Sequence, residues 1–392
     1  MKLLLVATKA PWPPVDGGRF LLLNTLEALA AAGCRLTLVA PVDLEAFDIG
    51  RVARELSAWC EPVLIPAAPL PPAAALLRSG GAPLSIARHS LPAVRQEVEH
   101  RLRAERFDLV HAEQLQAMTQ AEPAFGLRVP VVLRAQNVES DLWRAAAQRG
   151  RGVRGMLLRR EARRLAAWEG TAVRRAAATL ALTEEDAARL GELAVVSGRV
   201  RVVRAPFPEL PAGLGRLPGE PPVVVFGSRG WLPNEDSVAW YLKEVWPAVR
   251  SELPGAILHL YGVDLASFPP GVAVHPPPGD SGEAYPPGSI LAVPLRIASG
   301  VRIKILEAWA RGAPVVATPA ALAGLEVKDG REALVAREPR DFAAAIRRLH
   351  EEPALAASLI AEGRRARKER HDPQEIARRL MAEYEKVVAH PL

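Results

Sequence analysis

Short apolar runs alternate with segments of helical periodicity along the whole chain. In the first half, the runs that we predict as strands cover residues 2–7, 35–40, 62–65, 109–111, 129–134 and 178–182. In the second half, the predicted strands cover residues 223–226, 256–261, 272–274, 289–293 and 315–317. Apolar runs separated by helices are typical of parallel sheets in α/β proteins.

Helical periodicity between these runs predicts helices at residues 19–32, which Gly33 closes, at 236–252 and at 373–389. Residues 144–175 follow the same periodicity and predict one long helix with an arginine-rich face. We expect the Ala/Pro-rich stretch 66–83 to be a mobile loop.

A stretch rich in proline and glycine, residues 206–222, fits neither a helix nor a strand and predicts a linker. The alternation restarts after it, so the chain divides into two similar α/β halves. We expect one domain at residues 1–205 and a second domain at 223–370, followed by C-terminal helices.

Composition is that of an ordinary soluble protein, with 49% hydrophobic and 24% charged residues in 392. No run of eighteen apolar residues predicts a membrane span, and the short apolar run at the N-terminus predicts a strand and not a secretory signal. Two cysteines cannot form a disulfide framework, so we expect a cytoplasmic protein. Three asparagines and 36 prolines fit a thermophile or a GC-rich genome equally well.

The net charge of +6 is concentrated in the arginine-rich segment 144–175. Two interpretations stay open: a solvated helix face, or a surface that makes peripheral contact with anionic lipid at the inner face of a membrane. Trp168 is the single aromatic residue among these arginines, which argues against a partner that is nucleic acid.

The segment 293–318 places two cations where a helix disfavours them. The pattern after Gly300 predicts a helix that Gly312 ends, so Arg302 and Lys304 fall in its first turn. The free N–H groups there carry about half a positive charge, and each added cation costs about 0.3 to 1 kcal/mol. A bound phosphate reverses this effect, and Glu307 would reach a neutral polar group of the same ligand. The alternative is a surface ion pair between Lys304 and Glu307.

Other polar residues follow predicted strands, where ligands bind in open parallel sheets. Gly17, Gly18 and Arg19 form a glycine-bearing turn after the first strand, and Arg229 follows the first strand of the second half. Each of these turns suits a phosphate and equally suits a plain turn. Asn234 or Asp236 is expected to cap the helix after Arg229.

Two further strand ends carry candidate chemistry. His111 and Glu113 stand at a predicted strand end and are expected to face the open space between the domains, where either could take or orient a hydroxyl proton. A histidine that is simply satisfied in the core is the alternative and the commoner outcome at such positions. Gln136 and Asn137 close the next strand, where Asn137 either contacts a ligand or caps a helix. The chain lacks the motifs GxGxxG, GxxxxGK[ST], HExxH, paired CxxC and GxSxG, which argues against dehydrogenases, P-loop ATPases, zinc proteases and serine hydrolases.

Four segments together resemble the retaining glycosyltransferases of family 4: PPVDGGR, QNVES, GWLPNEDS and VPLRIASGVRIKILEAWARGAPVVAT. The resemblance implies the GT-B architecture, two facing Rossmann-like domains with parallel sheets and an interdomain cleft, the first domain for the acceptor and the second for the donor. It also implies that the C-terminal helix at 373–392 joins the first domain. The family's Glu-x7-Glu signature departs here, because its second glutamate matches Glu307 but its first falls on Ser299. Only Arg229 matches the family's Arg and Lys after the first strand of the second domain, so Arg302 and Lys304 are expected at the diphosphate.

The resemblance implies retaining transfer of a hexose from a nucleotide diphosphate, UDP or GDP, to a glycan or lipid-linked acceptor in polysaccharide biosynthesis. No cofactor or metal is expected, since the chain has no Asp-x-Asp pair. A nucleotide-sugar epimerase or hydrolase and a non-catalytic nucleotide-sugar binder are the alternatives. The expected catalytic residues are His111, Glu113, Arg302 and Lys304, and the expected acceptor residues are Gln136 and Asn137. The expected donor residues are Gly17, Gly18, Arg19, Arg229, Ser299, Gly300, Val301, Arg302, Lys304 and Glu307.

Overall fold

The computed structural model describes residues 1–78, 80–150, 152–196, 198–227, 232–264, 267–278, 280–297 and 299–390. The chain divides into two compact units. The first unit comprises Met1–Pro206, Ser299–Val301 and Pro373–Leu392, and the second comprises Phe207–Ala298 and Arg302–Asp372.

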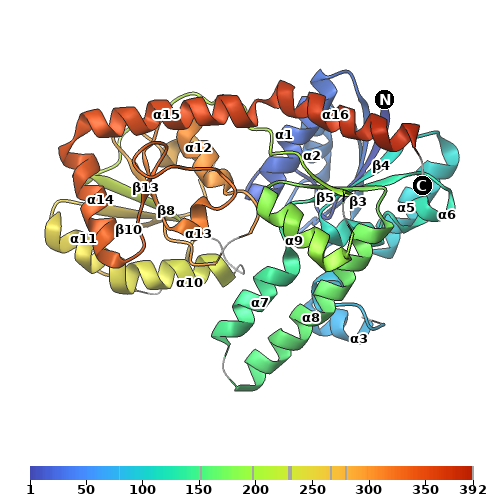
Figure 1. The fold of residues 1–392 in the computed structure, drawn as a ribbon, viewed down its shortest axis with the longest axis horizontal. Helices are drawn as coiled ribbons and strands as arrows, with labels where there is room; N and C mark the ends of the chain where they lie inside the picture. The colour runs from blue at the N-terminus through green and yellow to red at the C-terminus, as the bar shows by residue number, and fades with distance from the viewer. Residues whose placement is uncertain are drawn as a thin grey trace. The chain divides into compact units, whose positions relative to one another are not determined.

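A seven-stranded parallel sheet forms the centre of the first unit, in the order β3-β2-β1-β4-β5-β6-β7 (Figure 1). Its strands are β1 (Lys2–Val6), β2 (Arg35–Val42), β3 (Glu61–Pro66), β4 (Leu109–Glu113), β5 (Val131–Ala135), β6 (Ala178–Ala181) and β7 (Val200–Val202). The central strands β1, β4 and β5 are almost wholly buried, because helices cover both faces of the sheet.

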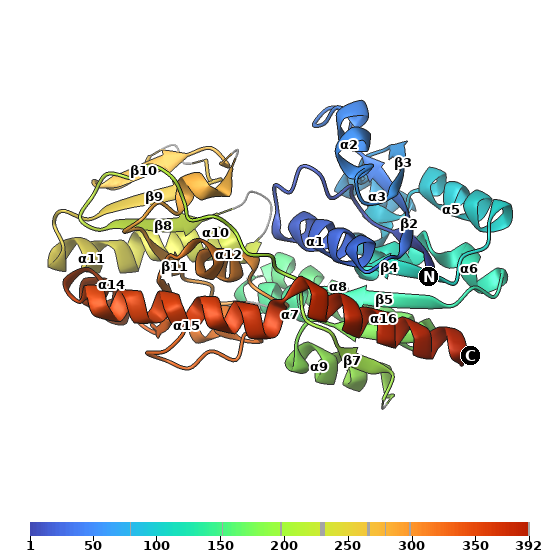
Figure 2. The ribbon, with the colours of Figure 1, turned by 90° about the horizontal axis from the view of Figure 1, so that it is seen from above.

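Helices lie on both faces of this sheet (Figure 2), and each face has its own apolar core. One core packs against α1 (Gly17–Ala31), α2 (Ile49–Leu56) and α16 (Pro373–Ala389). The other packs against α4 (Leu84–His89), α5 (Pro92–Ala104), η1 (Leu115–Thr119), α6 (Glu122–Gly126), α8 (Gly152–Arg175) and α9 (Glu184–Ala194). The C-terminal helix α16 therefore completes the fold of the N-terminal half of the chain.

The second unit contains a six-stranded parallel sheet in the order β10-β9-β8-β11-β12-β13. Its strands are β8 (Pro222–Phe226), β9 (Ile257–Tyr261), β10 (Val272–His275), β11 (Ile290–Val293), β12 (Val315–Ala317) and β13 (Leu334–Val335). Its helices are α10 (Leu232–Trp240), η2 (Tyr241–Val245), α11 (Trp246–Glu252), η3 (Ser281–Ala284), α12 (Ile303–Arg311), α13 (Pro319–Leu322), α14 (Pro339–Glu351) and α15 (Pro353–His371).

Both sheets have the Rossmann strand order 3-2-1-4-5-6, which the first unit extends with β7. The order reverses between β1 and β4 in one unit and between β8 and β11 in the other. Ligands of such sheets bind beyond the carboxyl ends of the strands at this reversal. Each unit therefore has one edge at which a functional site is expected.

The structure confirms every predicted strand and the two-sheet α/β class. The sequence analysis missed β7 and β13, which are short strands at the edges of their sheets. Residues 203–221 contain neither helix nor strand, as predicted. The prediction of a plain loop at 66–83 was wrong, because α3 (Pro72–Arg78) lies within it.

The long helix predicted at 144–175 is two helices, α7 (Glu139–Arg149) and α8, which lie side by side (Figure 1). The chain reverses through Gly150 and Gly152, and Gly152 has a positive φ of 58°. Gly155 of α8 packs so closely on Gly150 that an added Cβ would lie 2.2 Å from the Gly150 carbonyl oxygen. Helical periodicity alone cannot detect this reversal, because both helices have the same period.

We predict that Gly155→Ala destabilises the first unit by about 1–3 kcal/mol, because the new methyl group would overlap the Gly150 backbone. Gly126→Ala is the matched control, since nothing lies within 4 Å of an added Cβ there. We expect the control to leave stability unchanged or to raise it by up to about 1 kcal/mol. Urea unfolding followed by tryptophan fluorescence measures both, and equal effects would contradict the tight contact.

Candidate functional site

The carboxyl edge of the second sheet holds the two predicted cations. Helix α12 begins at Ile303, so Arg302 is its N-cap residue and Lys304 lies in its first turn, which contains no acidic residue. Gly312 ends the helix in the left-handed conformation with φ 84°, as predicted. Arg302 is only 5% exposed, so its guanidinium is buried at the positive end of a helix.

The Lys304 side chain reaches inward to the end of β8. Its Nζ donates to the Phe226 carbonyl oxygen at 3.1 Å and to Asn234 Oδ1 at 3.5 Å. Burial, together with the charge of Arg302, lowers the pKa of Lys304 to about 8. The cations are therefore held at the point where the strand order of the second sheet reverses, and they do not turn out into solvent.

Glu307 lies one turn further along α12 and is buried. Burial raises the pKa of Glu307, although Ser281 and Arg311 favour its charged form. Arg311 Nε lies 3.6 Å from Glu307 Oε1, too far for a hydrogen bond, and both atoms lack a hydrogen-bond partner among the described residues. A buried carboxylate oxygen without a donor is the kind of group that a ligand hydroxyl would satisfy.

The sequence analysis missed Arg311, which ties α12 to the loop after β10. Its Nη2 donates to Asp280 Oδ1 and to Ser281 Oγ, each at 2.9 Å. Asp280 also accepts from the Gly282 N–H at 2.7 Å. The structure thus brings the 280–282 turn close to Glu307. This proximity depends on tertiary contacts of Arg311, which the sequence does not show.

Three predictions concern the start of α10. Arg229 lies outside the described residues. The expectation that Asn234 or Asp236 caps this helix was wrong, because α10 already begins at Leu232 and both residues lie inside it. Asn234 instead accepts from Lys304, and Asp236 pairs with Arg296 through contacts of 2.7 and 3.1 Å.

A polar cluster occupies the corresponding edge of the first sheet, where β1 and β4 end. It surrounds a cavity of about 10 Å³ that is lined by Ala7, Thr8, Lys9, Gly18, Arg19, Leu22, Glu113, Gln114 and Gln136. An added Cβ at Gly18 would lie 3.0 Å from Gln136 Oε1 and 3.1 Å from Gln114 Nε2. Gly18 thus allows these two side chains to approach α1.

A chain of side-chain hydrogen bonds connects the residues of the cluster. Gln136 Nε2 donates to Glu113 Oε1 at 2.8 Å, and Gln136 Oε1 accepts from Gln114 Nε2 at 2.8 Å. The Thr8 hydroxyl donates to Gln114 Oε1 at 2.6 Å. Gln136 and Glu113 are therefore held in fixed orientations at the end of β4 and β5.

The sequence analysis missed Gln114. Its backbone has φ 73° and ψ 157°, a region that is essentially restricted to glycine and costs on the order of 1–3 kcal/mol. Hydrogen bonds from its backbone N–H to Arg134 and from its side chain to Gln136 hold it there. Strained residues cluster at functional sites, so the strain supports a functional role for this edge.

His111 does not face open space, and the alternative of a histidine satisfied in the core is confirmed. His111 is 0% exposed, its Nδ1 lies 2.6 Å from the Tyr384 hydroxyl of α16, and its Nε2 lies 2.8 Å from Glu113 Oε2. Both ring nitrogens are therefore occupied inside the first unit, and His111 can influence a ligand only through Glu113. Glu113 itself lines the small cavity.

Asn137 does not cap the following helix. Helix α7 begins at Glu139, and the Glu169 carboxylate of α8 accepts from the N–H groups of Glu139 at 2.7 Å and Ser140 at 3.2 Å. Burial raises the pKa of Glu169 to about 7, against the opposing effect of the Ser140 bonds. A capping carboxylate that lies 30 residues further along the chain leaves no local signal in the sequence.

The turn after β1 supplies a mixed set of charges. Asp16 caps α1 by accepting from the Arg19 N–H at 3.0 Å, and Lys9 Nζ contacts both Asp16 oxygens at 2.7 and 2.8 Å. The Arg19 guanidinium donates to the Ala10 carbonyl and lies 4.7 Å from the centre of the Phe47 ring. Gly17 is the exposed first residue of the helix.

The structure groups Ser299, Gly300 and Val301 with the first unit, whereas Arg302, Lys304 and Glu307 belong to the second. The Ser299 hydroxyl accepts from the Val138 N–H at 2.8 Å and donates to Asp186 Oδ1 at 2.9 Å. The Gly300 N–H donates to Asp186 Oδ2 at 2.9 Å. The Ser299 hydroxyl is thus engaged by protein groups.

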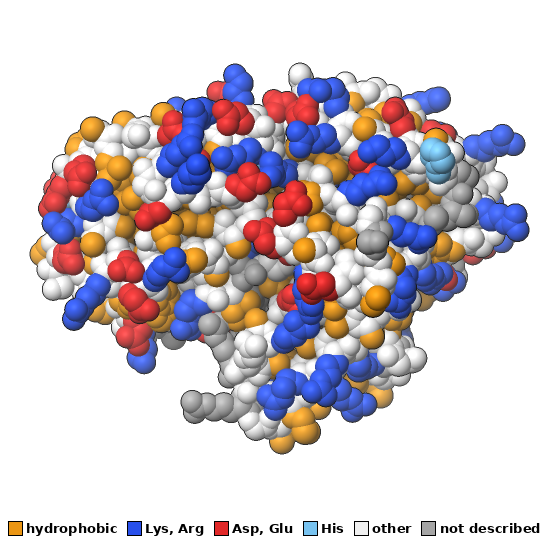
Figure 3. Space-filling model, in the orientation of Figure 1, with side chains coloured by type: hydrophobic (Ala, Val, Ile, Leu, Met, Phe, Trp, Pro, Cys, Tyr) orange, Lys and Arg blue, Asp and Glu red, His pale blue; other side chains and the backbone are white. Residues whose placement is uncertain are grey.

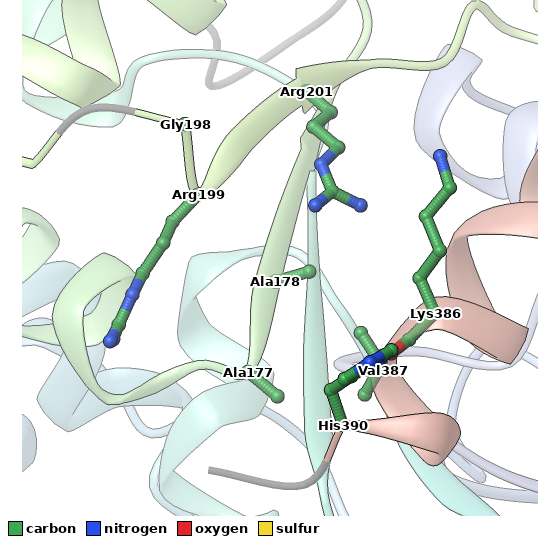
Figure 4. A pocket seen from close by; sticks show the side chains of 8 residues that line it. All are labelled: Ala177, Ala178, Gly198, Arg199, Arg201, Lys386, Val387 and His390. Atoms are coloured by element: carbon green, nitrogen blue, oxygen red, sulfur yellow. The ribbon is translucent and has the colours of Figure 1, made fainter.

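A second cavity, of about 280 Å³, lies at the opposite edge of the first sheet (Figure 4). It is lined by Ala177, Ala178, Gly198, Arg199, Arg201, Lys386, Val387 and His390. Glu383 accepts from both Arg201 and Lys386, and Arg199 points away from Lys386 in Figure 4. Its position at the amino ends of β6 and β7 is not where ligands of parallel sheets bind.

In the described part of the chain, no helix is long and apolar enough to cross a membrane. Among the same residues, no group of three or more His, Cys, Asp and Glu side chains is arranged to hold a metal ion.

Two protein-family models match the sequence. The glycosyl transferase 4-like domain matches residues 17–206, and glycosyl transferases group 1 matches residues 221–352. The two matches fall on the two sheets and together cover most of the chain. Comparison with curated proteins gives no match.

Solved structures of the same fold cover nearly the whole chain. HepE of Anabaena, solved with UDP and glucose, shares 15% identity at a TM-score of 0.66, over 98% of this chain and 100% of HepE. Sucrose-phosphate synthase of Thermosynechococcus elongatus shares 15% identity at a TM-score of 0.68, over 99% of each chain. A TarM variant of S. aureus, solved with Fondaparinux, alpha-GlcNAc-glycerol and UDP, shares 11% identity at a TM-score of 0.56, over 74% of this chain and 59% of TarM. The family matches and the two Rossmann-like sheets show that the chain belongs to the group 1 glycosyltransferases of the GT-B fold.

Proposed function

We propose that this protein transfers a hexose from a nucleotide diphosphate sugar to a glycan or lipid-linked acceptor, with retention of configuration and without a metal ion. The observation that carries the proposal is the pair of cations at the amino end of α12. Lys304 and Arg302 keep their positions despite burial and mutual repulsion, a cost that a bound diphosphate would offset.

The second unit would bind the donor. Arg302 and Lys304 would contact the diphosphate. Glu307 Oε1, which has no hydrogen-bond donor among the described residues, would accept a hydrogen bond from a ribose hydroxyl. The turn at 280–282, which Arg311 ties to this helix, would lie near the base. HepE has been solved with UDP-glucose, which supports UDP as the first nucleotide to test, with GDP as the other.

In the proposed reaction, the bond between the anomeric carbon and the diphosphate oxygen breaks. An acceptor hydroxyl oxygen bonds to that carbon on the same face, and its proton passes to the leaving phosphate oxygen. Negative charge develops on the diphosphate as the bond breaks, and fixed cations stabilise it without reorganising.

The first unit would hold the acceptor at the polar cluster where β1, β4 and β5 end. Gln136 and Glu113 line the small cavity and are oriented by hydrogen bonds, so they would position the attacking hydroxyl. His111 would act as a positioning residue behind Glu113. The roles proposed for Asn137 and for the Gly17–Arg19 turn rest on the resemblance to family 4.

One observation favours a second candidate, a nucleotide-sugar binder without transferase activity. Ser299 stands where family 4 members carry the glutamate for the donor sugar, and its hydroxyl is bonded to Val138 and Asp186. Binding of UDP with no turnover of any donor sugar would favour this candidate. Conversion of the donor in the absence of any acceptor would instead indicate an epimerase or a hydrolase.

We predict that Lys304→Ala abolishes most of the thermal shift that UDP, GDP or their sugars produce. Removing the buried ammonium should barely change the free protein, because burial disfavours its charge. The control is Lys328→Ala, which removes an exposed lysine of the same unit. A panel of UDP, GDP, ADP and dTDP sugars identifies the base, and an unchanged shift in Lys304→Ala would contradict the assigned site.

We also predict that nucleotide affinity falls as the pH rises through about 8. Lys304 loses its proton in the free protein near this pH, while a bound diphosphate keeps it protonated. Linkage then weakens binding by about tenfold at pH 9 relative to pH 7. Titration calorimetry measures the effect, and Lys304→Arg, which stays charged, should lose most of this pH dependence. The same slope in both proteins would rule out Lys304 as the titrating group.

We predict that Gln136→Ala lowers kcat/KM for the acceptor by about 10- to 100-fold and leaves nucleotide binding intact. The reason is that Gln136 both lines the cavity and orients Glu113. Gln148→Ala, an exposed glutamine on α7, is the control. Acceptor-dependent release of UDP gives the rates. A loss confined to nucleotide binding would refute the assignment of this edge to the acceptor.

A further inference from the structure

The hairpin of α7 and α8 projects from the first unit and carries exposed apolar side chains near its turn (Figures 1 and 3). Val153, Met156 and Leu157 are 69%, 57% and 55% exposed. Their spacing of i, i+3 and i+4 places them on one side of α8. Gly155, Ala162 and Leu165 are buried on the other side. This apolar face therefore has no role in the packing of the unit.

Four arginines of α8 surround this apolar face. Arg154, Arg159, Arg160 and Arg163 are exposed, and none of them forms an ion pair or hydrogen bond within the described residues. Between residues 152 and 160 the helix contains no acidic residue. Arg144 and Arg164, by contrast, pair with Asp141 and Glu161. The unpaired positive charge thus lies at the tip of the hairpin, beside the exposed apolar side chains.

A second exposed apolar pair belongs to an element that is tied to α8. Leu76 and Leu77 of α3 are 66% and 88% exposed. The loop that follows α3 is fixed to α8, because Arg164 donates to the carbonyls of Gly81 and Ala82 at 2.7 and 2.8 Å. Two segments of the first unit therefore expose leucines around the same helix.

We propose that the α7–α8 hairpin is a membrane-docking element whose occupant is an anionic lipid bilayer. Apolar side chains flanked by unpaired arginines are the composition with which a helix lies in the interface of such a bilayer. Charge complementarity selects anionic lipid, since each arginine near the surface adds attraction. A helix face that only contacts water would not be expected to carry Val153, Met156 and Leu157 together, because exposed apolar patches mark interaction sites. The proposal is independent of sugar transfer.

Vesicle co-sedimentation of the full chain tests the proposal, with phosphatidylcholine vesicles that contain or lack phosphatidylglycerol. We expect binding only to the anionic vesicles. Met156→Glu combined with Leu157→Glu should weaken that binding by at least about tenfold. Arg159→Glu combined with Arg160→Glu should weaken it by about fivefold or more for each arginine and reduce its salt sensitivity. Leu214→Glu, an 83% exposed leucine in the second unit, should bind as the unaltered protein does.

Circular dichroism and UDP thermal shift, measured on each variant, show that the fold and the nucleotide site are intact. The proposal is overturned if the unaltered protein does not bind anionic vesicles, or if the two double variants bind as tightly as it does. It is also overturned if the apolar double variant instead halves the molar mass in solution, because the hairpin would then join two copies of the chain. Loss of the UDP response would concern the proposed function and leave the vesicle result unaffected.

Discussion

The energetic cost of placing two cations at the amino end of α12 is the constraint on which the functional interpretation depends. Helix dipole, burial and mutual repulsion all disfavour charge at Arg302 and Lys304, and the lowered pKa of Lys304 expresses that cost. The chain nevertheless holds Lys304 there through the Phe226 carbonyl and Asn234. A site that is costly when empty and favourable when occupied by an anion is preorganised for a phosphorylated ligand.

The candidate site of the first unit has a different charge balance, because the cations Lys9 and Arg19 are matched there by Asp16 and Glu113. Its polar groups are arranged by a continuous series of hydrogen bonds from Tyr384 through His111, Glu113 and Gln136 to Gln114. Tyr384 comes from the last helix, which packs on α1. The C-terminus of the chain therefore helps to orient residues at the end of β4, more than 270 positions earlier in the sequence.

The alternation of apolar runs and helices was enough to predict both sheets, and the position of Gly312 was enough to predict the end of α12. The unusual position of Arg302 and Lys304 was also recognisable from the sequence, because the amino end of a helix is positive and normally disfavours cations. Arg311, Gln114 and the Glu169 cap were not, since each acts through a partner at least about 30 residues away or through a backbone angle. The two-helix hairpin escaped prediction because its turn preserves the helical period. For His111 two orientations stayed open, because a strand-end position does not reveal which way a side chain is buried.

The repeated strand order has a consequence for how such a protein can change over evolution. In both units the candidate residues lie at the carboxyl ends of the strands, or in the loops and helix starts that follow them, while the apolar cores lie on the faces of the sheets. Substitutions in those loops leave the packing of either sheet almost untouched. Under the proposed assignment of donor and acceptor to the two units, the two preferences can therefore diverge separately, each through substitutions in its own unit, without a loss of folding stability that would link them.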